Sequence, residues 1–126
     1  MEIRSIGFAA SHTPAHAEMS RFVEDVLGLT PLTVDGVGAT LFELPNGDVF
    51  GVAEPHEEGD PPERTLGLIV ADLDAAAVEL HAAGVETDGI SENARWRYTH
   101  FRAPDGKLYE LVEERDAYPD QSMTAR

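Results

Sequence analysis

Residues 42–52 read FELPNGDVFGV, and residues 101–111 read FRAPDGKLYEL. The Phe, Pro and Gly positions of these two segments coincide at one constant offset, and the remaining positions are chemically similar. A second pair of segments, SIGF at 5–8 and TLGL at 65–68, recurs at nearly the same offset. Two matches at one offset predict a duplicated structural unit of about 55–60 residues.

Each repeat predicts a strand, a helix and then three strands. Short apolar runs are typical of strands, and apolar residues at helical spacing indicate amphipathic helices. Thr13-Pro14 and Asp72 are suitable helix starts, and Gly28 and Gly84 are suitable helix ends. The predicted helices span 14–27 and 73–83. The predicted strands span 2–10, 30–35, 38–44, 48–54, 64–71, 85–89, 95–102 and 107–114.

The expected architecture is a single α+β domain over residues 1–115. It contains two βαβββ modules, 1–54 and 64–115, joined by an acidic linker over 55–63 that lacks periodicity. Residues 116–126 are predicted to form a polar C-terminal tail. We expect each helix to pack on the convex side of its sheet, which leaves the concave side open as a groove.

The composition excludes several classes of partner. The 126 residues include 24 acidic and 9 basic side chains, a formal net charge of −15, and no cysteine. This charge repels nucleic acids and anionic membranes. No apolar run is long enough to span a membrane, and no signal peptide is visible, so we expect a cytoplasmic protein. An acidic chain with one lysine is typical of a halophile, and equally of an arginine-rich mesophile.

Three segments resemble signatures of the vicinal oxygen chelate (VOC) superfamily, the glyoxalase, bleomycin-resistance and extradiol-dioxygenase group. FVEDVLGL at 22–29 resembles FYxDVLGL, and FRAPDGKLYEL at 101–111 resembles FxDPDGNxxEL. VADLD at 70–74 resembles the start of the second helix in that group. Ala103 departs from the usual aspartate. The resemblance covers residues 2–114 and implies paired βαβββ modules whose U-shaped mixed sheet surrounds a groove.

The resemblance also implies a place for a divalent metal, with two ligands from the first strands of the modules and two from the last. These positions fall on Ser5, Thr65, Gly51 and Glu110. Only Glu110 has a side chain that the family uses as a ligand, because hydroxyl groups are weak neutral ligands. We therefore expect no cofactor. A divalent metal would require a displaced histidine, with His100 or His12 the best placed.

Strand alternation divides residues 95–101 into two faces. Trp96, Tyr98 and His100 share one face, while Arg97 lies on the other with Arg95, Thr99 and Phe101. Either face could line the groove: the aromatic set would supply stacking surface, and Arg97 would anchor a carboxylate. Phe101 is expected to pack in the core. Glu110 could be a general base, or a relic of the metal site that anchors a ligand or pairs with an arginine.

The other histidines give weaker indications of a functional site. His12 and His16 flank the first helix at a spacing of four, which more often gives solvated side chains than a metal site. His56 is expected to be exposed in the linker, and His81 partly buried on the second helix.

Three functions are compatible with the sequence. The first is a glyoxalase- or bleomycin-resistance-like protein that binds a small molecule in its groove without a metal of the family type. Its candidate groove residues are Ser5, Gly51, Thr65, Trp96, Arg97, Tyr98, His100 and Glu110. The second is a metal-dependent lyase, isomerase or dioxygenase with a degenerate ligand set, in which Glu110 would be catalytic. The third is a dimerisation module with an emptied groove. The resemblance implies a homodimer.

Overall fold

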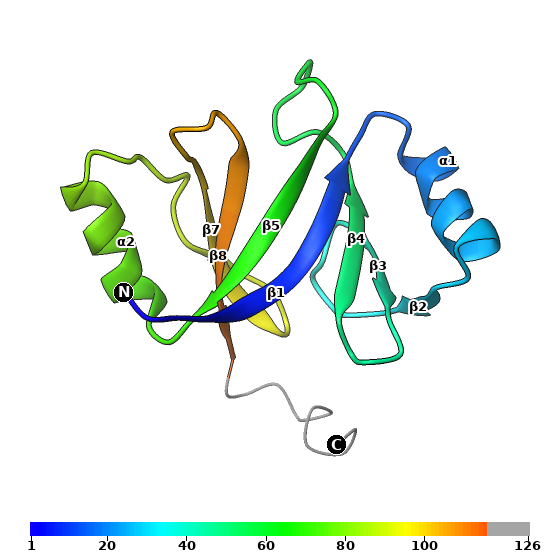
Figure 1. Cartoon of the computed structure of the whole chain (residues 1–126), viewed down its shortest axis with the longest axis horizontal. Coiled ribbons are helices and arrows are strands. Elements are labelled where there is room, and N and C mark those ends of the chain that lie inside the picture. Colours follow the sequence, from blue (N-terminus) through cyan, green and yellow to red (C-terminus); the bar gives the residue numbers. More distant parts are fainter. Residues whose placement is uncertain (116–126) are drawn as a thin grey trace.

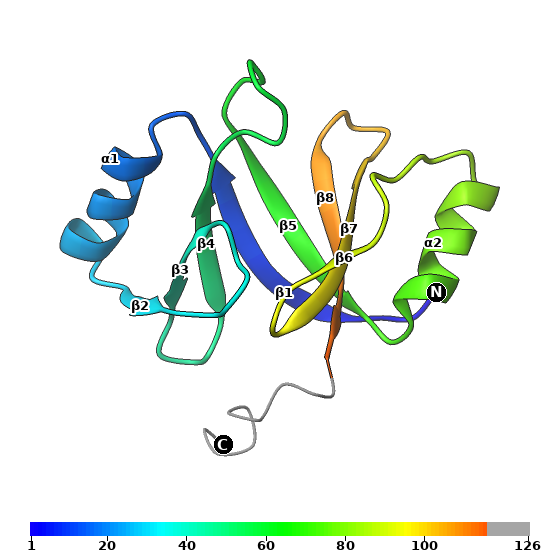
Figure 2. The ribbon, with the colours of Figure 1, turned by 180° about the vertical axis from the view of Figure 1, so that it is seen from behind.

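The computed structural model describes residues 1–115, and the predicted tail over 116–126 lies outside these described residues. Eight strands form one sheet in the order β2-β3-β4-β1-β5-β8-β7-β6. Figures 1 and 2 show this curved sheet from its two sides. The elements are β1 (Ile3–His12), α1 (His16–Arg21), the π-helix η1 (Phe22–Val26), β2 (Thr30–Leu32), β3 (Thr40–Glu43), β4 (Val49–Ala53), β5 (Glu63–Val70), α2 (Leu73–Ala82), β6 (Ser91–Glu92), β7 (Trp96–Arg102) and β8 (Leu108–Glu114).

The two halves of the chain build matching halves of the sheet. In each half the first strand pairs in parallel with the last, as β1 does with β4 and β5 does with β8. The halves meet where β1 and β5 pair antiparallel at the centre. The predicted α+β class and U-shaped mixed sheet are confirmed.

The two helices begin differently. Asp72 caps α2 as predicted, because its carboxylate accepts a hydrogen bond from the Ala75 N–H at 3.0 Å. The predicted cap at Thr13 is wrong, since its hydroxyl accepts from the Ala15 N–H and α1 begins only at His16. This bond closes a turn two residues along the chain, which is a usual alternative to capping.

One predicted strand is missing from the second half. Residues 85–89 contribute only a single bridge, between Thr87 and Phe101. The Asp88 carboxylate accepts the backbone N–H of His100, and Gly89 has a φ of +89° that turns the chain away. The short strand β6 follows this turn and pairs with β7.

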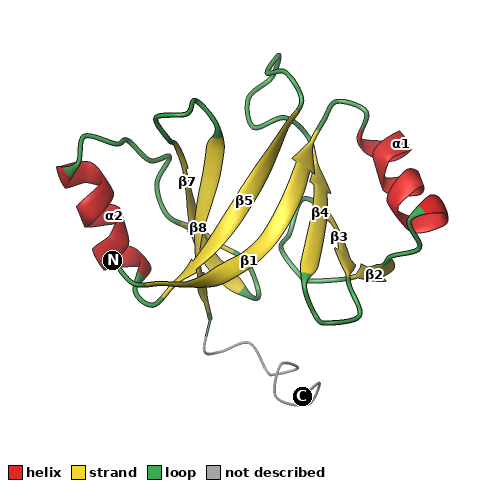
Figure 3. Ribbon diagram, viewed as in Figure 1, coloured by secondary structure: helices red, strands yellow, loops and turns green. Residues whose placement is uncertain are grey.

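Both helices pack on the convex side of the sheet, as expected. On α2, Leu73 and Ala76 pack against Val70 and Leu111. Beside α1, Val23 packs against Phe42 and Val52. Figure 3 shows the two helices on the outer flanks with the strands between them. Side chains of the opposite strand faces, including Val49 and Val112, form a third cluster in the concave side.

Within residues 1–115, no helix is long and apolar enough to cross a membrane.

Candidate functional site

The concave side of the sheet holds a cavity of about 190 Å³. Alternate residues of five strands point into it, because successive side chains of a strand point to opposite faces. Residues 37–39 close one side. The lining residues are Phe8, Ala10, His12, Val37, Gly38, Ala39, Leu41, Val49, Gly51, Ala53, Asn93, Trp96, Tyr98, His100 and Glu110.

Aromatic rings form much of this lining. Phe8 and Trp96 lie with their ring centroids 6.3 Å apart, and Tyr98 meets the His100 ring edge to face at 5.8 Å. Of the two alternative faces of residues 95–101, the structure therefore turns the aromatic one toward the groove. Phe101, on the other face, packs beside Leu111 and α2 as expected.

Arg97 does not reach the groove, so its prediction as a groove residue is wrong. Strand alternation turns its side chain to the convex side, where it contacts Asp74 of α2 at 3.2 Å and Glu113 at 3.1 Å. Hydrogen bonds to Asp74 and Glu113 raise the pKa of Arg97. This arginine ties α2 to the sheet instead of anchoring a ligand.

His100 lies between two carboxylates at one end of the cavity. Its Nε2 is 3.0 Å from Glu110 Oε1, and its Nδ1 is 2.8 Å from Asp88 Oδ2. The His100 and Glu110 side chains are only 16% and 13% exposed. Burial opposes the charged imidazole, but the hydrogen bonds and charges of Glu110 and Asp88 raise the pKa of His100. Imidazole and carboxylate therefore form a polar pair beside the aromatic surface.

The Asp88 carboxylate contacts both the backbone N–H and the side chain of His100. One carboxylate oxygen accepts from the His100 N–H at 2.9 Å and from the Thr99 hydroxyl at 3.3 Å. Burial opposes ionisation, yet the hydrogen bonds from His100 and Thr99 lower the pKa of Asp88. The pKa of the nearby Tyr98 hydroxyl is raised, chiefly by burial and then by the charges of Glu110 and Asp88.

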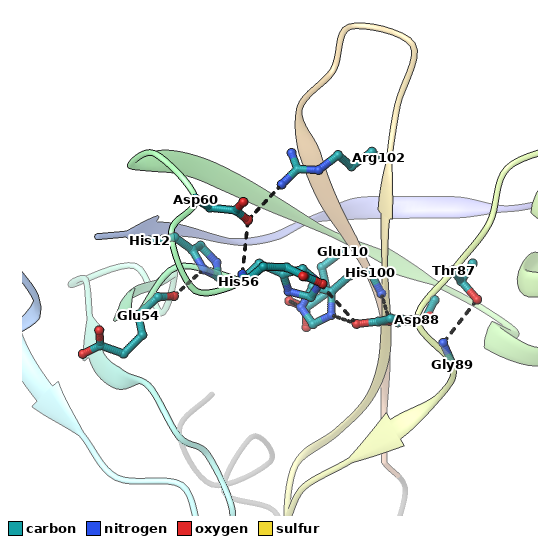
Figure 4. A network of polar contacts seen from close by, with 12 residues as sticks. His12, Glu54, His56, Asp60, Thr87, Asp88, Gly89, His100, Arg102 and Glu110 are labelled. Atoms are coloured by element: carbon teal, nitrogen blue, oxygen red, sulfur yellow. Dashed lines mark hydrogen bonds and ion pairs between the residues drawn. The ribbon is translucent and has the colours of Figure 1, made fainter. Parts of the chain in front are cut away.

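Sequence reasoning missed Asp88 and misjudged His56. The linker brings the His56 ring to 4.8 Å from the His100 ring, and its side chain is 24% exposed. His56 Nε2 lies 3.7 Å from Asp88 Oδ2 (Figure 4). His56, Asp88 and His100 also line a second, larger cleft of about 780 Å³ between the linker and the 83–88 segment. The spacing of these residues in the sequence gives no indication of this contact.

The four positions that the family would use for a metal do not converge. Thr65 of β5 pairs with Ala10 of β1. Ser5 lies five residues from Ala10 along β1, where it pairs with Ile69. At about 3.3 Å per residue this separates Ser5 from Thr65 by roughly 16 Å. Ser5 is exposed outside the cavity, and its prediction as a groove residue is wrong. These residues do not fit a metal of the family type.

Gly51 and Thr65 differ in their relation to the cavity. Gly51 is buried and lines it. Thr65 is fully buried and is not part of the lining, so its prediction as a groove residue is wrong. Its hydroxyl has no hydrogen-bond partner among the described residues. An isolated hydroxyl is a weak ligand, which agrees with the misfit.

The remaining histidines have separate environments. His12 lines the cavity, and its Nδ1 lies 3.0 Å from the Glu54 carbonyl oxygen. His16 contacts the Glu54 carboxylate and the Thr40 hydroxyl. His81 is exposed on α2, so its predicted partial burial is wrong. In the described part of the chain, the histidine and acidic side chains grouped closely enough to hold a metal ion are His56, Asp88 and His100.

No protein-family model matches this sequence, and no curated protein is significantly similar to it. Solved structures do match the fold. Methylmalonyl-CoA epimerase from Mycobacterium tuberculosis matches with a TM-score of 0.68 and 20% identity, over 98% of this chain and 93% of the epimerase chain. BphC, a halotolerant catechol dioxygenase, matches with a TM-score of 0.65 and 22% identity over 94% of this chain. The Mn(II)-bound glyoxalase from Novosphingobium aromaticivorans matches with a TM-score of 0.64 and 18% identity over 88% of this chain.

The epimerase has nearly the length of this chain, whereas the matches span 42% of the dioxygenase chain and 39% of the glyoxalase chain. At these identities the likeness establishes the fold. The resemblance predicted from the three sequence segments is thus confirmed as a shared architecture. The ligand has to be inferred from the residues that line the groove.

Proposed function

We propose that this chain, which has the fold of the vicinal oxygen chelate superfamily, binds a small molecule in its concave groove without a metal at the family position. The observation that carries this proposal is the cavity itself, in which aromatic surface adjoins the His100–Glu110 pair. Ligand sites are commonly apolar concavities with a few polar groups that fix orientation.

The size of the cavity limits the ligand. Its volume of about 190 Å³ is below the roughly 300–1,000 Å³ of sites for drug-sized molecules. An apolar cavity of about 150 Å³ holds benzene. The ligand is therefore a molecule with about one ring, whose faces contact Phe8, Trp96 and Tyr98 and whose polar substituent reaches Glu110 and His100.

The charge of the site favours one class of substituent. Glu110 and Asp88 both flank His100, and the chain carries a net charge of −15. This field disfavours anions and attracts hydrogen-bond donors and cations. We expect a neutral or cationic ligand with a donor that reaches the Glu110 carboxylate.

Trp96 is the sole tryptophan, so its indole N–H resonance reports on the groove. The experiment titrates the protein separately with phenol, benzylamine and benzoate and follows this resonance by NMR. Saturable shifts with phenol or benzylamine, and weaker binding of benzoate, are expected. A Trp96 resonance that none of the three probes shifts in a saturable manner contradicts the proposal.

A second candidate function is a metal-dependent lyase, isomerase or dioxygenase. One observation favours it: Glu110, the side chain of the family ligand type, lies beside the group formed by His56, Asp88 and His100. In this function Glu110 would be catalytic. Metal analysis of the purified protein, combined with turnover assays before and after chelation, separates it from simple binding.

A further inference from the structure

Three potential metal ligands meet at the edge of the second cleft, and none of them occupies one of the four family positions, although His100 contacts Glu110. They come from three separate segments: His56 from the linker after β4, Asp88 from the segment after α2, and His100 from β7 (Figure 4). One ligand atom of each residue lies within 4.8 Å of the other two. Two imidazoles and one carboxylate are a donor set that binds divalent transition metals.

The present distances are close to those of a coordinated set. Metal–ligand bonds of about 2.0–2.2 Å in tetrahedral geometry separate neighbouring ligand atoms by about 3.3 Å. Asp88 Oδ2 lies 2.8 Å from His100 Nδ1 and 3.7 Å from His56 Nε2. His56 belongs to a linker without helix or strand, so a small shift of this side chain completes the set.

Glu110 fixes the His100 ring in the orientation that a metal requires. A ligating histidine usually donates its other ring N–H to a carboxylate, which selects the tautomer and directs the lone pair. His100 Nε2 lies 3.0 Å from Glu110 Oε1, so Nδ1 can face Asp88 and an ion. Glu110 would then be a positioning residue behind the ligand.

The charges of the cleft favour a cation. The carboxyl groups of Asp88 and Glu110 both lie beside His100, and Asp60 and Glu57 line the same cleft as Asp88. The positive side chain in the lining, Arg102, makes two hydrogen bonds to Glu63 and an ion pair with Asp60. The open cleft also leaves room for a further ligand, such as water.

We propose that His56, Asp88 and His100 bind a divalent first-row transition-metal ion, with Glu110 orienting His100. This site is distinct from the family position at Ser5, Gly51, Thr65 and Glu110, and it goes beyond the proposed groove binding without depending on it. Because two of its ligands are imidazoles, it prefers Zn²⁺ to Mg²⁺, which favours oxygen ligands.

The test is calorimetric titration of chelator-treated protein with Zn²⁺ and, separately, with Mg²⁺. The buffer contains about 0.5 M NaCl to screen non-specific attraction by the acidic surface. We expect one Zn²⁺ per chain and much weaker Mg²⁺ binding. The variant H56A changes a half-buried linker residue, and the variant D88N keeps an oxygen that can accept the His100 N–H. Each should lower Zn²⁺ affinity at least about 10-fold.

Two further variants separate coordination from general damage. H81A removes an exposed histidine of α2 and should leave Zn²⁺ binding unchanged. E110Q should weaken binding by about 10-fold through the lost orientation of His100, with the stoichiometry unchanged. Wild-type affinity in H56A and D88N, or equal affinities for Zn²⁺ and Mg²⁺, overturns the proposal. Loss of metal binding with intact probe binding in the groove would leave the proposed function standing.

Discussion

Arg102, which lines the second cleft, and Glu63 form a two-bond pair: Nη1 lies 3.2 Å from Oε2, and Nη2 lies 3.1 Å from Oε1. Glu63 also accepts the Leu108 backbone N–H at 3.0 Å. The pair therefore ties the start of β5 to both strands of the hairpin that carries His100 and Glu110.

The first prediction concerns the pH dependence of stability through Glu63. The hydrogen bond from Arg102 lowers the pKa of Glu63, although burial partly opposes the shift. A depressed carboxyl pKa stabilises the fold above the unfolded-state value of about 4.3, and this contribution is lost as pH falls below it. At pH 7, E63Q should lose about 1–2 kcal/mol in urea unfolding.

The difference between wild type and E63Q should shrink as the pH falls toward 3, because Glu63 of the wild type takes up its proton as the pH approaches its lowered pKa. E24Q, at an exposed position of η1, is the control and should be neutral at both pH values. An E63Q deficit that is equally large at pH 3 and pH 7 would show that the carboxylate charge is not its cause.

The second prediction compares two fully buried threonines. The Thr65 hydroxyl has no partner among the described residues, whereas the Thr99 hydroxyl donates to Asp88 at 3.3 Å. T65V removes an unsatisfied polar group at nearly constant volume and should stabilise the protein by about 1 kcal/mol. T99V removes a partnered one and should destabilise it by about 1–3 kcal/mol. Denaturant midpoints measured for both variants decide this, and equal signs would refute it.

The third prediction tests the floor of the groove, where the Phe8 ring lies directly against Gly67. A Cβ added at Gly67 would lie 2.2 Å from Phe8 Cε1. G67A should therefore destabilise the protein by about 1–3 kcal/mol through overpacking. The double variant F8L/G67A should recover part of this loss relative to F8L alone. Strict additivity of the two changes in thermal unfolding would rule out the contact as the cause.

The fourth prediction concerns assembly. We expect a homodimer, and Ile3, Ile6 and Leu66 are exposed apolar side chains on the two central strands. The net charge of −15 opposes self-association at low ionic strength, so salt should favour the dimer. Light scattering across a series from 0.05 to about 2 M NaCl measures the mass, and a monomer at both ends refutes the prediction.

The internal repeat predicted the fold because the residues that recur in both halves lie at turns. Pro104 and Gly106 with their counterparts Pro45 and Gly47 mark the hairpins between the last two strands of each half, and Gly47 and Gly106 both have positive φ. Helical spacing likewise located α2 and its cap at Asp72. The segment 85–89 was predicted as a strand because propensity does not show that the Asp88 side chain replaces a backbone partner.

Only part of the site was accessible from the sequence. Alternation correctly placed Trp96, Tyr98 and His100 on one face, whereas the pairing of His100 with Glu110 was not predicted. Alternation could not decide which face is concave, so Arg97 was wrongly included. The contact of His56 with Asp88 joins a linker to a loop, and neither has a periodic pattern that predicts its partner.

We propose that a small ligand occupies the cavity beside Trp96. Gly38 lines this cavity, its φ is not positive, and a Cβ there meets no heavy atom within 4 Å. G38L should therefore fill the cavity without clashing with the backbone, whereas A82L adds the same side chain at an exposed position on α2. The decisive measurement is the phenol and benzylamine affinity of G38L, A82L and wild type, read from the Trp96 indole resonance. We expect saturable binding to wild type and A82L, and loss of binding in G38L with stability retained. Unchanged affinity in a folded G38L would contradict it.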